Sequence, residues 1–278
     1  KMDLIASAKG MTEIATSLLP HDSRIRWNRS VYNLTLGLLA KGWDDYDYRF
    51  WKPGAKSKKR LPPPSYWSGE PLTGRSLLIW TEQGFGEIIL YASMIGEIGR
   101  TASRLVIETG TKMIPVLKRA FPWAEVVAAG ETDLKTIDYQ IPAGSLGKFC
   151  RRSFKDFPRH SGYLEANQNV RQQARRNLLS VSRGRPIIGV SWKSKNESLG
   201  PGKSMALTDL LPVLTKDYCF VSLQYGECQS ELAAVREQGI DVHEIENCGD
   251  NLEEFFATVD ACDLVITTSS TTAHAAGA

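Results

Sequence analysis

Apolar residues recur at helical spacing over residues 1–52, and Pro20 ends the first of two such stretches. The second stretch covers residues 24–51, where a small and apolar first half is followed by an aromatic second half. Gly42 lies between the two halves, and we expect the turn of a helix-turn-helix unit there. One such unit cannot bury its own apolar face, so it either caps a longer helical array or packs on the next domain.

Residues 53–72 show no periodicity and contain a basic run followed by Pro62, Pro63 and Pro64. Basic and proline-rich segments are extended and tend to separate domains. We therefore predict a linker over 53–72.

From residue 73 onward, short apolar runs alternate with helical patterns, which is typical of parallel α/β sheets. We predict two Rossmann-like α/β lobes, over 73–165 and 166–278, with a polar helix at 163–183 joining them. The predicted strands are 77–80, 105–108, 125–127, 138–141, 187–191, 219–223, 242–245 and 264–267. Ligands of such folds bind at the carboxyl ends of the strands.

Composition narrows the classes of protein that fit. Hydrophobic residues make up 42% and charged residues 23%, as in ordinary globular proteins. The net charge of +3 is too small to predict nucleic-acid binding, although it suits an anionic small ligand. The five cysteines include no C-x-x-C pair and there is no long apolar run, so we expect a cytoplasmic protein without a transmembrane segment.

The first candidate site is the segment 81–87, between a predicted strand and an apolar helix. Gly84 and Gly86 let the backbone approach a ligand, and Glu87 falls in the first helical turn, where a carboxylate can accept a proton from a hydroxyl. A plain strand-to-helix turn explains the same residues, because glutamate is favoured in a first turn by the helix dipole.

The second candidate is the lysine-rich loop 191–196, which follows the strand 187–190. Ser191 and Lys193 open it, and Lys203 precedes the next helical pattern. Lysines and flexible glycines at a strand end fit a pyrophosphate site. A solvated polar loop is the alternative.

The third candidate is a run of six hydroxyl side chains over 267–272, after the last strand. A helix cap uses one or two hydroxyls, whereas six provide many hydrogen-bond donors for phosphate. The candidate residues in and after this run are Ser269, Ser270, Thr271, Thr272 and His274. Histidine at such a place is more often packed and hydrogen-bonded than a ligand or base.

No metal-ligand spacing and no G-x-S-x-G elbow stand out in the chain. Asp45-Tyr46-Asp47 matches the Asp-x-Asp of metal-dependent glycosyltransferases, but it falls in the helical segment, so we interpret it as a solvated helix face.

Several segments together carry a family resemblance, in the order 42–43, 46–51, 67–72, 80–87, 188–192, 220–224, 263–267 and 272–278. Together they resemble the glycosyltransferase-like domain that follows tetratricopeptide repeats in bacterial proteins. That domain is related to ADP-heptose heptosyltransferases and has the GT-B architecture. The resemblance covers nearly the whole chain.

The resemblance implies an inverting, metal-independent transfer from a UDP-, ADP- or GDP-linked sugar to a protein or glycan acceptor, which the repeat helices help to present. It implies that Glu87 is the base, that Lys193 and Lys203 neutralise the diphosphate, and that Gln224 faces the nucleotide. The implied donor-binding residues are Gly84, Gly86, Ser191, Lys193, Lys203, Gln224, Ser269, Ser270, Thr271, Thr272 and His274.

Ser269 departs from the family pattern, because related heptosyltransferases have an aspartate there that contacts the sugar. We also expect the second lobe to be incomplete at its C-terminus. A non-catalytic module for protein assembly is therefore the alternative function, and a sugar epimerase of the same architecture is a third.

Overall fold

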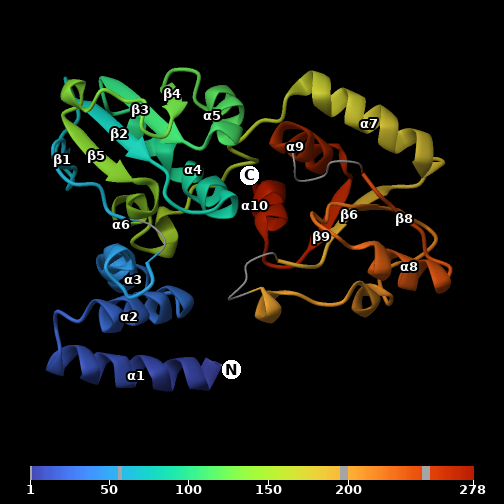
Figure 1. Ribbon diagram of the computed structural model, residues 1–278, viewed down its shortest axis with the longest axis horizontal. Helices are drawn as coiled ribbons and strands as arrows, with labels where there is room; N and C mark the ends of the chain where they lie inside the picture. The colour runs from blue at the N-terminus through green and yellow to red at the C-terminus, as the bar shows by residue number, and fades with distance from the viewer. Residues whose placement is uncertain (1, 56–57, 195–199, 246–250) are drawn as a thin grey trace. The chain divides into compact units, whose positions relative to one another are not determined.

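The computed structural model describes residues 2–55, 58–194, 200–245 and 251–278 (Figure 1). Two compact units are present, and each contains one parallel β-sheet. The first consists of Lys1–Gly84, Tyr91–Thr111 and Phe121–Ser161, and the second of Phe85–Leu90, Lys112–Ala120 and Gly162–Ala278. The mixed α/β class with parallel sheets is thereby confirmed, while the domain boundaries drawn from the sequence stay a prediction.

The N-terminal segment is helical. It contains α1 (Met2–Leu18), α2 (Ser23–Thr35), α3 (Leu39–Tyr46) and the 3-10 helix η1 (Asp47–Phe50). The turn predicted at Gly42 is wrong: the chain turns at Gly37, which has a φ of 74°. Gly42 lies within α3, where an added Cβ would be 2.6 Å from Cγ of Leu34. This glycine therefore allows α2 and α3 to pack closely.

The helical segment shares the hydrophobic core of the first sheet. Phe50 is buried together with four residues of the first unit, Leu78, Trp80, Val106 and Ile137. The helical segment and the first sheet therefore form one packed body.

The sheet of the first unit has the strand order β1-β5-β2-β3-β4, with all pairs parallel. Its strands are β1 (Ser65–Tyr66), β2 (Ser76–Trp80), β3 (Arg104–Thr109), β4 (Glu125–Ala128) and β5 (Tyr139–Pro142). The helices along this part of the chain are α4 (Phe85–Gly99), η2 (Thr111–Met113), α5 (Ile114–Ala120), η3 (Leu134–Thr136), η4 (Ala143–Leu146), α6 (Gly147–Cys150) and η5 (Phe154–Asp156). The segment predicted as a linker contains β1, which pairs with β5.

The sheet of the second unit has the order β8-β7-β6-β9 and is also parallel. Its strands are β6 (Ile187–Ser191), β7 (Cys219–Ser222), β8 (Val242–His243) and β9 (Leu264–Thr267). Its helices are α7 (Gln168–Ser182), η6 (Pro201–Lys203), η7 (Leu207–Leu210), α8 (Gln229–Glu237), α9 (Leu252–Ala261) and α10 (Thr271–Gly277). The helical pattern that follows Lys203 forms only the short 3-10 helix η7. The polar helix predicted from residue 163 begins at Gln168 as α7, because the Asn167 side chain caps it.

Within the described residues, no helix combines the length and apolar character needed to cross a bilayer.

Candidate functional site

Two of the predicted loops meet at the carboxyl edge of the second sheet. Ser191 at the end of β6 pairs in register with Thr267 at the end of β9. The backbone N–H of Thr268 donates to the Ser191 carbonyl over 3.1 Å. The lysine loop and the hydroxyl run are therefore neighbours in space, although they are far apart along the chain. The side chain of Ser191 is buried and its hydroxyl donates to Oε1 of Gln224.

Gln224 joins the end of β7 to the lysine loop. Its Oε1 accepts the backbone N–H groups of Trp192 (3.0 Å) and Lys193 (2.9 Å), and its Nε2 donates to the carbonyls of Lys193 and Tyr225. The residue is only 6% exposed. The amide is thus engaged on both sides by backbone, so Gln224 shapes the loop, and a contact with a nucleotide stays a prediction.

The lysines of this region differ in their surroundings. Lys193 forms an ion pair with Glu231 of α8. Lys203 ends η6 and is exposed, with no ion pair among the described residues. Lys195 and Asn196, which the sequence places in the same loop, lie outside the described residues. Lys203 is therefore the better placed of the two described lysines to meet an anion.

The hydroxyl run begins α10. Ser270 is the N-cap residue, and its Oγ accepts the N–H of Thr272 over 3.2 Å and contacts Oγ1 of Thr267 at 3.2 Å. Thr272 is fully buried, and its hydroxyl has no hydrogen-bond partner in the described part of the chain. Ser269 is exposed and Thr271 half-buried. Capping therefore uses Ser270, Thr267 donates to the carbonyl of Thr268, and the accessible hydroxyls of the run are those of Ser269 and Thr271.

His274 lies against the first turn of α4, which belongs to the same unit. A Cβ added to Gly86 would be 3.0 Å from Cδ2 of His274 and 3.5 Å from Oγ1 of Thr271. Gly86 thus permits a close approach to its backbone, as expected. The groups that approach it are the side chains of His274 and Thr271, whereas the prediction was a ligand. Gly84 is the N-cap of α4 and exposed, with an ordinary φ of −72°.

Glu87 is exposed in the first turn of α4, and its charge acts on His274. Burial lowers the pKa of His274 below its ordinary value, the carboxylate of Glu87 opposes that change, and Lys203 adds to it. The charges of Glu87 and Lys203 therefore both act on His274 within the second unit.

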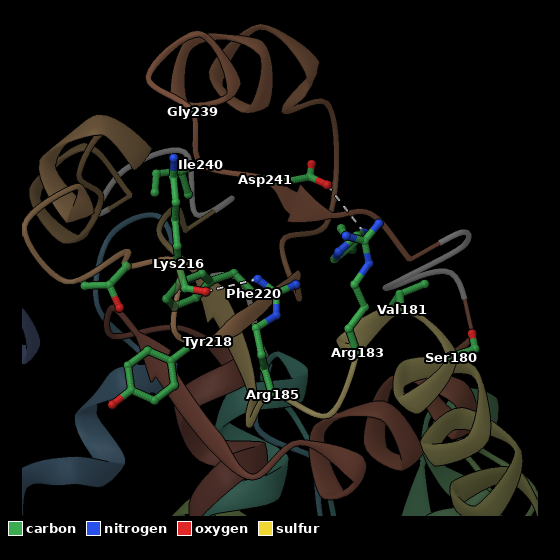
Figure 2. Close-up of a pocket in the computed structure, with 12 residues that line it drawn as sticks. Ser180, Val181, Arg183, Arg185, Lys216, Tyr218, Phe220, Gly239, Ile240 and Asp241 are labelled. Atoms are coloured by element: carbon green, nitrogen blue, oxygen red, sulfur yellow. Dashed lines mark hydrogen bonds and ion pairs between the residues drawn. The ribbon is translucent and has the colours of Figure 1, made fainter.

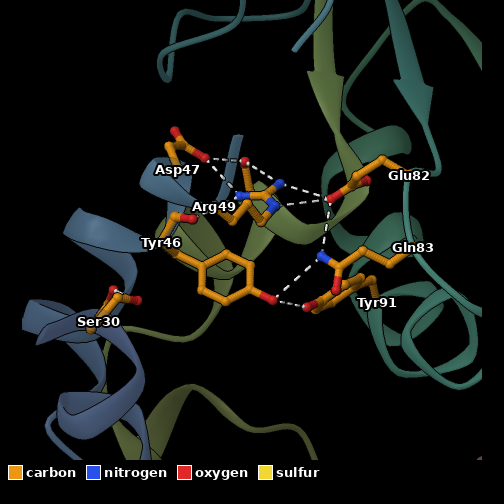
Figure 3. Close-up of polar contacts among 9 residues, drawn as sticks. Ser30, Tyr46, Asp47, Arg49, Glu82, Gln83 and Tyr91 are labelled. Carbon is orange, nitrogen blue, oxygen red and sulfur yellow. Dashed lines mark hydrogen bonds and ion pairs between the residues drawn. The ribbon is translucent and has the colours of Figure 1, made fainter. Parts of the chain in front are cut away.

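The interpretation of residues 45–47 as a solvated helix face is wrong. The side chain of Asp45 is fully buried between Arg26 and Arg29, at 2.7 and 2.5 Å. Tyr46 is also buried and takes part in a polar cluster of the first unit (Figure 3). The side chains point inward because α3 packs on α2 and on the lobe, an arrangement that helical spacing alone does not reveal.

That cluster is the main polar feature that sequence reasoning missed. Arg49 of η1 donates to Glu82 at the end of β2 (2.8 Å) and to Ser145 after β5 (3.1 Å). Charged residues placed among aromatic ones over 43–51 were the only signal of it in the sequence. Because such residues also occur on solvated helices, the signal was ambiguous.

A separate hollow of about 420 Å³ lies at the opposite, amino edge of the second sheet (Figure 2). It is lined by basic and polar residues that include Arg183, Arg185, Lys216 and Tyr218. Arg185 is committed to structure, since it donates to the carbonyls of Ser182 and Lys216. Ser191, Gln224 and the hydroxyl run lie elsewhere, at the carboxyl edge of this sheet.

Among the described residues, no group of three or more His, Cys, Asp or Glu side chains is arranged to hold a metal ion.

Comparison with known proteins gives one sequence relative and several similar structures. No protein-family model matches the chain. Protein FlbA of Caulobacter vibrioides is 28% identical in an alignment of 283 positions that covers 93% of this chain and 47% of FlbA. The chain therefore spans about half the length of that relative.

Two solved structures share the fold. ADP-heptose lps heptosyltransferase II of E. coli has a TM-score of 0.52 and 15% identity, over 72% of this chain and 81% of that one. The family 9 glycosyl transferase of Veillonella parvula has a TM-score of 0.50 and 13% identity, over 74% of this chain and 78% of that one. The chain thus has the fold of these glycosyltransferases.

Proposed function

We propose that the chain is a glycosyltransferase region of GT-B architecture that moves a sugar from a nucleotide-sugar to a protein or glycan acceptor. One observation carries the proposal: the ends of β6, β7 and β9 bring Ser191, Gln224 and the hydroxyl run to one edge of the second sheet. Ligands of parallel α/β folds bind at this edge. The likeness of fold to heptosyltransferase II supports the same reading.

In this proposal the second unit holds the donor. The exposed hydroxyl of Ser269 and the half-buried hydroxyl of Thr271 donate to phosphate oxygens. Lys203 supplies positive charge for the leaving diphosphate, because Lys193 is already paired with Glu231. No metal ion is required for charge neutralisation in this arrangement.

Glu87 is the proposed general base. It is exposed and can therefore reach an acceptor hydroxyl, and no hydrogen bond to its carboxylate competes within the described residues. Proton removal makes that oxygen a better nucleophile, which attacks the anomeric carbon from the face opposite the diphosphate and inverts the configuration.

In the same proposal the protein works in the cytoplasm, and the N-terminal helices are a tetratricopeptide-like segment of a bacterial protein that presents the acceptor.

A Glu87→Gln substitution tests the base role. We expect the turnover number of the full-length protein to fall by about two orders of magnitude, as is usual when a general base is removed. Nucleotide affinity should stay within twofold of wild type, because the change removes no proposed phosphate contact. Glu237→Gln, at an exposed position of α8, is the matched control. Equal turnover in the Glu87→Gln and wild-type proteins would remove Glu87 from this role.

A non-catalytic assembly module is the second candidate, favoured by Ser269 in the aspartate position and by the pairing of Lys193 with Glu231. Titration calorimetry with UDP, ADP and GDP distinguishes the two. A transferase binds at least one of them, whereas a module binds none.

A further inference from the structure

Arg49 is a buried cation that links three segments of the first unit. Its side chain is 5% exposed, and its guanidinium donates to Oε1 of Glu82 through both Nε (3.2 Å) and Nη2 (2.8 Å). Nη2 also reaches Oγ of Ser145 (3.1 Å), and Nη1 reaches Oδ1 of Asp47 (3.0 Å). The same guanidinium stacks over the ring of Phe50, 4.1 Å from its centroid. Every side of the cation is therefore occupied.

The cluster continues from Glu82 to the helix that carries Glu87. Nε2 of Gln83 donates to Oε1 of Glu82 (3.3 Å) and contacts the hydroxyl of Tyr46 (3.4 Å). That hydroxyl lies 2.5 Å from the hydroxyl of Tyr91, one helical turn after Glu87 in α4. Figure 3 shows the hydroxyl of Tyr46 pointing toward both Gln83 and Tyr91, with Arg49 facing Glu82.

These contacts lie on both sides of the stretch 84–90. Glu82 and Gln83 precede Gly84, and Tyr91 follows the first turn of α4. All of them are held by residues 46–49 of the helical segment. The helical segment thus fixes both ends of the stretch that carries Glu87.

A glycine at the centre of the cluster shows how closely it is packed. A Cβ on Gly144 would be 2.8 Å from Oε1 of Glu82, 3.1 Å from Nη2 of Arg49 and 3.2 Å from Nε2 of Gln83. The backbone after β5 therefore approaches the ion pair as closely as a residue without a side chain permits.

We infer that Arg49 is a positioning residue for Glu87: the Arg49–Glu82 pair, with Tyr46 and Tyr91, sets the backbone from which the base projects. This inference rests on the proposed function. It makes the helical segment part of the catalytic unit, in addition to any role in acceptor binding. Loss of Arg49 removes the ion-pair partner of the buried Glu82 carboxylate, and loss of Glu82 leaves Arg49 paired with Asp47 at 3.0 Å. Either change removes the contact that holds the backbone at residues 82–83, so we expect this segment to shift.

The test compares Arg49→Gln and Glu82→Gln with Arg152→Gln in the full-length protein. The control breaks the exposed pair between Arg152 and Asp44, which joins the same helical segment to the same lobe. We expect the two cluster variants to lose roughly 10- to 100-fold in kcat, the scale of a small misplacement of a catalytic group. Their KM for the donor and their affinity for nucleotide should change less than threefold, because neither substitution removes a proposed phosphate contact. The control should keep wild-type kcat.

Two further measurements separate positioning from general loss of structure. Guanidinium ion, added far below denaturing concentration, should restore part of the kcat of an Arg49→Ala variant and none of that of Glu87→Gln. Hydrogen exchange should rise in the peptide covering 81–91 and stay unchanged in β6 and β7. If a cluster variant does not fold, Tyr46→Phe, which removes a single hydroxyl, replaces it in the same assays.

The outcomes are distinct. Wild-type kcat in Arg49→Gln, or parallel losses in kcat and donor affinity, overturns the inference. A wild-type protein that binds no nucleotide and transfers no sugar overturns the proposed function instead. In that event, hydrogen exchange at 81–91 still decides whether Arg49 holds the loop.

Discussion

Gln224 offers a quantitative test of the architecture at the carboxyl edge of the second sheet. A Gln224→Leu substitution keeps approximate size and removes the oxygen that accepts the N–H groups of Trp192 and Lys193 at 3.0 and 2.9 Å. Both donors belong to the backbone, so they stay in place when the side chain changes.

The expected cost follows from the burial of the two donors. A buried N–H left without a partner costs about 1–3 kcal/mol. Trp192 is fully buried, so its N–H bears the full penalty, whereas Lys193 is half-buried and water reaches it more easily. We therefore expect a loss of about 2–3 kcal/mol in the free energy of unfolding.

Equilibrium urea unfolding, followed by circular dichroism, measures this loss. At a slope of about 2 kcal/mol per molar urea, the midpoint should fall by about 1 M. The control is Gln172→Leu, an exposed position of α7 that should change stability by less than about 0.5 kcal/mol. A Gln224→Leu midpoint within the range of the control would refute the role given to the Gln224 amide.

Two other predictions concern close packing and titration. Gly144→Ala places a methyl group 2.8 Å from Oε1 of Glu82 and should destabilise the first unit by about 1–3 kcal/mol in thermal unfolding. The control is Gly110→Ala, where nothing lies within 4 Å of the added Cβ. Equal melting temperatures for the two variants would contradict the close packing at Gly144. Burial lowers the pKa of His274 below 6.5, so its contribution to stability is present above pH 6.5 and is lost as the pH falls through the folded-state pKa. His274→Asn should therefore flatten the decline of the urea midpoint between pH 7 and 5, and parallel profiles for the two proteins would count against this assignment.

Most strands were predictable because a strand buried on both faces appears in the sequence as a short, nearly continuous apolar run. The runs at 77–80 and 187–191 are almost continuously apolar, as expected of parallel strands covered on both sides. In contrast, β1 has two residues beside a proline run and forms only by pairing with β5. No local pattern can predict a strand whose stability comes from a distant partner.

The residues of the candidate site also fall into a predictable and an unpredictable group. Ser191 and the hydroxyl run were found because they follow apolar strands, and parallel strands place their carboxyl ends at one edge. The orientation of Gln224 and the partners of Arg49 depend on residues that the fold brings in from elsewhere. Glu82 is 33 positions from Arg49, and Ser145 is 96 positions away. Spacing along the chain carries no information about such contacts.

The pairing of β1 with β5 also has a consequence for biosynthesis. The contacts that anchor the early chain come late: Pro64 receives a hydrogen bond from Gln140, 76 residues further on, and Asp47 one from Ser145, 98 residues further on. At translation rates of about 5–20 residues per second, these intervals last about 4 to 20 s. Throughout this time, the aromatic face of the helical segment has no completed sheet to cover it. These contacts of the first unit can therefore form only after β5 and the residues that follow it have been synthesised.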